Sequence, residues 1–242
     1  MTEDADQISE MRPELDEALL GLDQLAQENA EEGLAMFATL PEPVQGLAAF
    51  QLVLARTQQA LKQLDKAKTI AEQIVSADEE NADAHHLLAD ILEDQENTQE
   101  ANSHFIRTLR LDKKSYEEGA SLPEAELKKA LLQILKSTCA ELPAEYQSPA
   151  RIELFPTEKD VENGVDPRAL SIWVTGDAPK GYLVLYAANL DAEFGDLVEF
   201  DEFAPHVCDT IRGEIAGHLS FSEEMLQKLG WEKSELPAGP QP

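Results

Sequence analysis

Large and small hydrophobic residues recur with a period of 34 positions in the first half of the chain. A large residue followed directly by a small one appears three times. Twelve positions after each of these small residues comes another small residue, and four positions further an aromatic residue or an alanine. The recurring sets are Leu20, Leu54 and Leu88; Gly21, Ala55 and Ala89; Gly33, Ala67 and Ala101; and Phe37, Ala71 and Phe105. Small residues let paired helices approach closely, so the pattern predicts repeated helical hairpins.

The spacing of helix-breaking residues agrees with this interpretation. No proline lies within residues 44–122 and no glycine within 47–118. The period is that of tetratricopeptide repeats, whose helix–turn–helix units stack into an array. We predict units over residues 14–47, 48–81 and 82–115. The first unit is the weakest because "LPEPVQG" interrupts it.

In such an array the first helix of each unit lines a concave face, which commonly binds peptides. The second and third units place polar and charged residues on this face, namely Arg56, Gln59, Asp83, His86, Asp90 and Glu93. These residues form either a partner-binding groove or a merely solvated surface. The first unit has leucines and an alanine there instead, which we expect to pack against other residues: Leu15, Ala18, Leu22 and Leu25.

The second half has a different pattern. Ser121, Pro123 and Glu124 form a capping-box signal before an amphipathic helix that ends near "LPAEYQSP". Strands are predicted at "RIELF", "LSIWVTG" and "GYLVLYAAN", with a turn at "GDAPKG". Two helices follow, at "EFDEFAPHVCDTIRGEIAGHL" and "FSEEMLQKLGW", and Gly230 is expected to end the second.

These elements predict an α+β protein, in which an α-helical tetratricopeptide-like array precedes a small α/β domain. We expect a flexible N-terminus over residues 1–13, the helical repeats over 14–120, the second domain over 121–232 and a disordered tail over 233–242.

Charge and cysteine content narrow the function classes. The chain has 48 acidic and 19 basic residues, a net charge of -29. This field repels nucleic acid and anionic lipid, and favours either solubility alone or a basic protein partner. Only two cysteines are present, and the N-terminus has no signal-peptide pattern, so a cytoplasmic location is expected. No apolar run is long enough for a membrane span.

Residues 124–232 resemble the minimal zincin-like metallopeptidases of bacteria. The resemblance rests on "ELPAEYQS", "GVDPRALSIWVTGDAP", "YLVLYAANLD" and a long helix followed by "LSFSEEMLQKLGW". In that family the helix carries the motif H-E-x-x-H. Here Gly213 and Gly217 stand at the two histidine positions, Glu214 at the glutamate, and His218 at a following histidine.

The replacement removes the chemistry of the motif. Two histidines four residues apart share a helix face and bind one zinc ion, and the glutamate takes a proton from the zinc-bound water. Glycine has no ligand atom. The resemblance therefore implies a degenerate site in which Glu214 is vestigial and no metal or other cofactor is held. The glycines arose either by drift or because they leave a shallow trough that admits a packed strand, a side chain or a partner.

Two other hypotheses remain open at this stage. A divergent zinc metallopeptidase could use a rearranged site of His206, Glu214, His218 and an acidic residue of the last helix, Glu223 or Glu224. An acidic mimic of nucleic acid is a weaker alternative, because the acids are dispersed along the chain. The favoured prediction is a non-catalytic interaction or scaffold protein with a protein or peptide partner of basic character; the sequence leaves its oligomeric state open.

Overall fold

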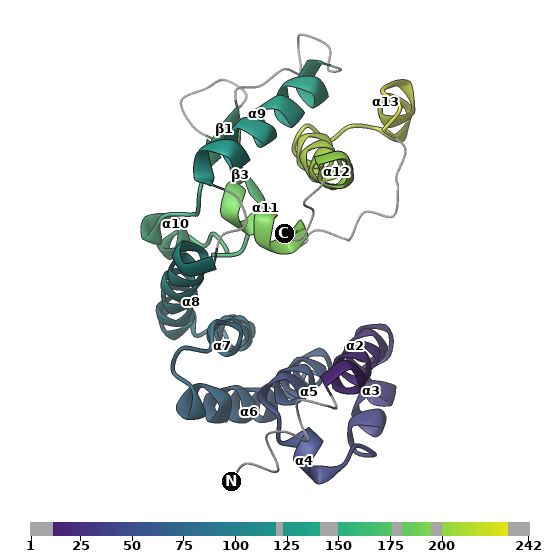
Figure 1. Ribbon diagram of the computed structural model, residues 1–242, viewed down its shortest axis with the longest axis vertical. Coiled ribbons are helices and arrows are strands. Elements are labelled where there is room, and N and C mark those ends of the chain that lie inside the picture. The colour runs from purple at the N-terminus through teal and green to yellow at the C-terminus, as the bar shows by residue number, and fades with distance from the viewer. Residues whose placement is uncertain (1–11, 120–122, 141–149, 176–180, 195–199, 232–242) are drawn as a thin grey trace. The chain divides into compact units, whose positions relative to one another are not determined.

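A computed structural model describes residues 12–119, 123–140, 150–175, 181–194 and 200–231 (Figure 1). The chain forms two compact units, Met1–Asp112 and Lys113–Pro242. Their division falls within helix α8 (Thr98–Gly119), whereas the sequence suggested a boundary after residue 120. The predicted cap at Ser121, the turn over 176–180 and the tail over 233–242 lie outside the described residues.

The first unit is helical throughout its described part. Its helices before α8 are α2 (Arg12–Glu28), α3 (Ala30–Phe37), α4 (Glu42–Gln45), α5 (Ala48–Ala60), α6 (Leu64–Ala77) and α7 (Ala82–Asp94). Helix α2 begins inside the segment that was expected to be flexible. Asn81 caps α7, because its side-chain oxygen accepts a hydrogen bond of 2.9 Å from the Ala84 amide.

The predicted period of 34 residues reappears in the backbone of two turns. Lys62, between α5 and α6, and Glu96, between α7 and α8, both have positive φ, at 57° and 62°. In each turn the next amide donates a 2.8 Å hydrogen bond back to a helix carbonyl, Gln63 to Gln58 and Asn97 to Leu92. This is the geometry of a Schellman helix end, used twice at equivalent positions.

Small residues at the repeated positions allow close helix packing in the second and third units. Each of four alanines there has no exposed surface: Ala55, Ala67, Ala89 and Ala101. Helix α6 packs against both α5 and α7. The burial of equivalent positions follows the sequence prediction.

The first unit departs from that pattern. Leu20, at the position of the buried Leu88, is 59% exposed, whereas Leu22 and Ala26 are buried. A side chain at Gly33 would meet the Ala26 backbone at 2.7 Å, so α2 and α3 approach closely there. Leu15, Ala18 and Leu22 do pack into the core, as predicted for the apolar stripe, together with Phe37, Phe50 and Val53.

The second unit combines a small sheet with helices. Besides the last residues of α8, its elements are α9 (Glu124–Ala140), β1 (Ala150–Glu153), α10 (Glu158–Glu162), β2 (Ser171–Val174), β3 (Tyr182–Tyr186), α11 (Ala187–Phe194), α12 (Phe200–His218) and α13 (Glu223–Lys228). The strand order is β1-β3-β2, with β1 parallel and β2 antiparallel to β3. The fold as described is α+β, mostly helical with this one sheet.

Burial explains the roles of the three strands. The central strand β3 is an apolar run buried from Leu183 to Tyr186, whereas β1 alternates between half-buried and exposed residues. One prediction at this point was wrong: Ala187–Asn189 begin α11 and do not continue the strand. All three side chains are buried, and a buried apolar run does not by itself show where a strand ends.

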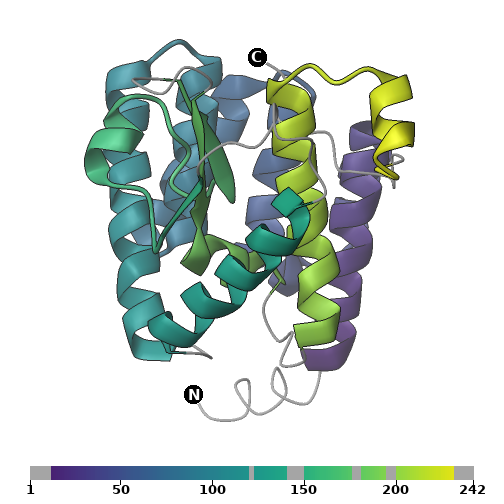
Figure 2. The same ribbon diagram turned by 90° about the horizontal axis from the view of Figure 1, so that it is seen from above.

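Helix α12 lies against α9 and against strand β2, and Figure 2 shows it as the long yellow-green helix beside the teal α9. Its buried residues Val207, Ile211 and Ile215 recur every four positions and join the leucines of α9 in the core. Helix α13 ends as expected, with Gly230 at φ 68°. Among the described residues, no helix combines the length and apolar character needed to cross a membrane.

Candidate functional site

The two glycines of interest lie on the C-terminal half of α12. Gly213 is partly exposed and Gly217 is exposed. A β-carbon built at Gly217 would have no neighbouring atom within 4 Å. No described strand or side chain of this chain therefore fills the space at Gly217. The described residues of the protein therefore do not pack into a trough at Gly217.

Glu214 differs from the solvated glutamate that the sequence alone would allow. Its side chain is largely buried, and this burial raises the pKa of the carboxyl group, while the nearby Ser171 hydroxyl and the His218 imidazole oppose the rise. The Ser171 side chain is 8% exposed, and its Oγ has no hydrogen-bond partner among the described residues. The hydroxyl thus lies near the carboxyl group but outside hydrogen-bond geometry.

His218 is held by an aromatic contact. Its ring stacks on Trp173 of β2, with ring centroids 4.3 Å apart and an interplanar angle of 15°. Ser171 and Trp173 are two positions apart on one strand, so they share a face, and Glu214 and His218 share a face of α12. The site is therefore a contact between one face of β2 and one face of α12.

The proposed alternative ligands are not all brought together, although Glu214 and His218 share a face of α12. His206 stacks on Phe194 of α11, with centroids 5.5 Å apart, whereas His218 stacks on Trp173. Glu223 lies exposed in the first turn of α13, behind its cap residue Ser222. Within the described ranges, no group of three or more histidine, cysteine, aspartate or glutamate residues could hold a metal ion. The structure gives the rearranged zinc site no geometric support.

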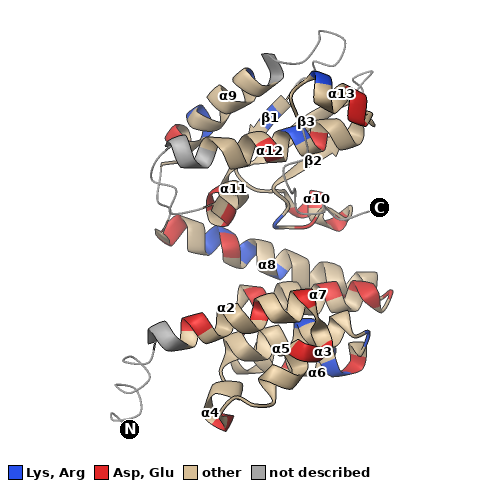
Figure 3. Ribbon diagram, turned by 90° about the vertical axis from the view of Figure 1, so that its right-hand side faces the viewer, with Lys and Arg blue, Asp and Glu red and all other residues tan. Residues whose placement is uncertain are grey.

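A second candidate surface lies on α7. The residues Ala84, His85, Leu87, Leu88, Ala89, Ile91 and Leu92 are buried. The predicted groove residues on the same helix all retain exposed surface, and we call them the α7 stripe: Asp83, His86, Asp90 and Glu93. Three of the four are acidic, and Figure 3 shows the red positions along this helix. The helix thus presents a polar, negatively charged face.

The α7 stripe is supported by local contacts. His86 Nδ1 lies 3.3 Å from an Asp90 carboxylate oxygen, and the His86 ring meets the edge of Phe105 at 5.5 Å between centroids. On α5, Arg56 is exposed and Gln59 is half-buried. Gln59 Nε2 donates a 3.0 Å hydrogen bond to Asp94 at the end of α7. One predicted groove residue of α5, Gln59, therefore contacts α7 directly, through Asp94, which was not among the predicted groove residues.

Sequence reasoning missed four residues that the structure makes prominent. Ser171 and Trp173 complete the contact with α12, and His85 pairs with His104 of α8. Alternation along the strand predicted at "LSIWVTG" is a signal that could have placed the first two on one strand face, but it cannot show which helix covers that face. The histidine pair joins side chains from two helices, and no local pattern marks such a pair.

In comparisons with known proteins, no family model, no curated protein and no solved structure matches the chain. The tetratricopeptide-like and zincin-like interpretations therefore rest on the residues described above.

Helix stability offers a direct test of the Gly217 environment. We expect Gly217→Ala to raise the free energy of unfolding by about 0.5–1 kcal/mol, because alanine loses less backbone entropy in a helix and meets nothing within 4 Å. Urea denaturation measures the change. Gly230→Ala is the matched control: it also has open space but sits at φ 68°, so it should destabilise. A destabilised Gly217→Ala variant would contradict the open position.

Proposed function

We propose that this protein is a non-catalytic interaction protein. A tetratricopeptide-like helical array would provide its docking surface, and a zincin-like unit that has lost its zinc ligands would act as a second surface or a rigid support. The observation that carries the proposal is the face of α12. It presents Gly213 and Gly217 where a zinc peptidase needs two imidazoles, and its nearest imidazole, His218, is stacked on Trp173.

The α7 stripe supports the choice of partner. A helix that buries most of its residues while exposing Asp83, Asp90 and Glu93 offers carboxylates to a cationic peptide. The net charge of -29 attracts basic segments from a distance and repels phosphate backbones. We therefore propose a protein or peptide partner with a basic segment, and no nucleic-acid or membrane ligand.

The cysteine chemistry is compatible with a cytoplasmic location. Cys208 is a free thiol, and its sulfur lies 3.2 Å from the Thr138 hydroxyl at the α9–α12 contact. Only one other cysteine, Cys139, is present in the chain. A protein with so few cysteines does not rely on a disulfide framework, so we propose the reducing cytoplasm as its compartment.

Metal analysis tests the loss of catalysis. Protein purified without chelators should contain no stoichiometric zinc and should show no peptidase activity, and Glu214→Gln should change neither result. Elemental analysis that finds tightly held zinc at one ion per chain would overturn the proposal. A peptidase activity that Glu214→Gln abolishes would favour the divergent metallopeptidase instead.

Charge substitution tests the docking surface. Replacing Asp83 and Asp90 by asparagine and Glu93 by glutamine should weaken capture of a basic partner from native lysate, because the partner loses its carboxylate contacts. The matched control removes the same charge from exposed acids elsewhere in the unit, with Glu31→Gln, Glu42→Gln and Glu96→Gln. Equal loss of binding in both triple variants would show a general charge effect and would contradict a specific surface on α7.

A further inference from the structure

Two histidines from different helices form one hydrogen bond inside the first unit. His85 Nδ1 on α7 lies 2.8 Å from His104 Nδ1 on α8, and the ring centroids are 5.1 Å apart. His85 is 7% exposed. A distance of 2.8 Å between two ring nitrogens requires one proton between them, so one ring must donate and the other must accept.

The surroundings decide which ring donates. His85 Nε2 lies 3.2 Å from the Glu79 carbonyl oxygen, which can only accept, so the proton of neutral His85 sits on Nε2. Its Nδ1 is then a bare acceptor, and His104 must donate from Nδ1. Arg107 Nη2 donates to the same Glu79 carbonyl at 3.1 Å, which ties that carbonyl to α8 as well.

The two histidines respond differently to added protons. A proton on His104 Nε2 leaves the Nδ1–H donor in place and keeps the contact. A proton on His85 Nδ1 while His104 Nδ1 keeps its own puts two N–H groups face to face at 2.8 Å, and the hydrogen bond cannot exist. We propose that the His85–His104 pair is a proton-operated clasp between α7 and α8, closed while one proton lies between the two Nδ1 atoms and opened when each Nδ1 carries its own proton.

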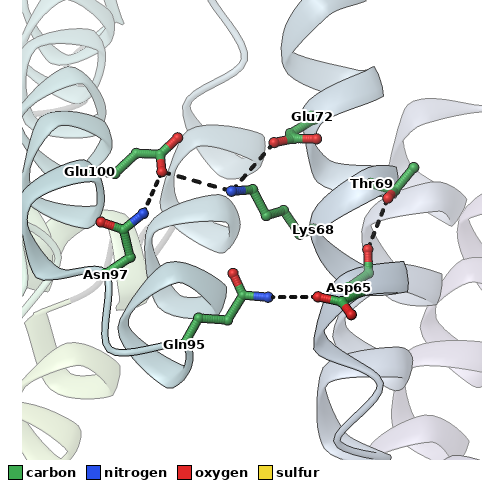
Figure 4. A network of polar contacts seen from close by, with 7 residues as sticks. All are labelled: Asp65, Lys68, Thr69, Glu72, Gln95, Asn97 and Glu100. Carbon is green, nitrogen blue, oxygen red and sulfur yellow. Dashed lines mark hydrogen bonds and ion pairs between the residues drawn. The ribbon is translucent and has the colours of Figure 1, made fainter.

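Charged groups on the neighbouring elements act on both rings. Burial lowers the pKa of His85 most strongly and Arg107 lowers it further, against Glu79 and Asp78. Burial also lowers the pKa of His104, with His85 and Lys68 adding to the effect and Glu100 and Glu72 opposing it. Lys68 is held 3.6 Å from Glu72 and 3.7 Å from Glu100 (Figure 4), so the lysine offsets part of the effect of the two carboxylates. The clasp is therefore closed at neutral pH.

The direction of the pH effect follows from these lowered values. A histidine whose folded pKa lies below its unfolded value contributes stability above about pH 6.5, and this contribution is lost as the pH falls. For one histidine that stays neutral in the folded state, the unfolding equilibrium constant should rise about thirtyfold between pH 7.5 and pH 5.

Full-length variants separate the clasp from other titrating groups. His85→Gln supplies an uncharged carbonyl that can accept a hydrogen bond from His104 Nδ1. Between pH 7.5 and pH 5 its unfolding constant should therefore rise less than that of the wild type, by a factor of up to about thirty. His206→Gln, which removes an exposed histidine of the other unit, is the matched control, and an equal loss of pH dependence in both variants would contradict a specific role of the pair. Identical pH dependence in His85→Gln and wild type would overturn the clasp.

A measurement on the unmodified protein covers the case in which the variant fails to fold. Nitrogen NMR of the histidine rings at pH 7.5 should show the proton of His85 on Nε2 and that of His104 on Nδ1. Separate protons on both Nδ1 atoms at this pH would overturn the proposal. Hydrogen exchange of the α7 and α8 amides should accelerate at pH 5 relative to the intrinsic rate, and unchanged protection would likewise contradict an opening clasp.

Discussion

Histidine at positions 213 and 217 should raise the affinity of the protein for zinc above that of the wild-type chain. The Gly213→His, Gly217→His double variant restores two imidazoles four residues apart on α12, with Glu214 already in place between them. Residues at this spacing share a helix face and can bind one ion. The open space at Gly217 admits the larger side chain without displacing a neighbour.

Calorimetry and thermal denaturation with zinc would measure the gain. Zinc at about one hundred times its dissociation constant stabilises a folded protein by about 2.7 kcal/mol, provided that the unfolded chain does not bind it. The control is Gly213→Ala, Gly217→His, which has one new imidazole and the same restored helix propensity. A folded double variant that binds zinc no better than this control would contradict the proposed zincin-like role of the α12 face.

Alanine at position 181 should destabilise the second unit by about 2–4 kcal/mol, since it combines backbone strain with a collision. Gly181 precedes β3 and has φ 73°, a conformation that favours glycine. Its added β-carbon would lie 2.6 Å from the Val174 carbonyl oxygen and would also collide with the Trp173 indole nitrogen. Relieving the collision requires Gly181 to move away from Val174 and the Trp173 indole.

Chemical denaturation of Gly181→Ala, followed by tryptophan fluorescence, measures this loss. Gly164→Ala is the matched control, because Gly164 also has positive φ, at 91°, but has nothing within 4 Å. Gly164→Ala should therefore be destabilised only by the strained backbone conformation and not by a collision. Equal destabilisation of the two variants would show that the close approach of Gly181 to Trp173 does not contribute to the change in the free energy of unfolding.

The parts of the fold that were predictable are those that local pattern determines. Ala55, Ala89, Ala67 and Ala101 are buried because a repeated small residue has one structural use, close contact between helices. Leu20 obeys the same period but is exposed, because α2 turns Leu22 and Ala26 toward the core instead. Periodicity reports equivalent positions in a sequence, and the packing of a terminal unit need not follow it.

The candidate site shows the same limit. The sequence predicted that Glu214 and His218 lie on one helix, and α12 contains both residues. It could not show that His218 would stack on Trp173 or that burial would raise the pKa of Glu214, because both depend on which strand packs against the helix. The four candidates for a rearranged metal site are close in sequence, yet His206 and His218 contact different rings from different elements.

Each of the five histidines in the chain meets another ring: His85 and His104 meet each other, His86 meets Phe105, His206 meets Phe194 and His218 meets Trp173. Aromatic ring currents displace the resonances of protons held near them. The imidazole C–H signals of this protein should therefore be dispersed and individually assignable. The five histidines can therefore serve as NMR probes without chemical labelling. Three of them report on the helical unit, and two report on the surroundings of α12.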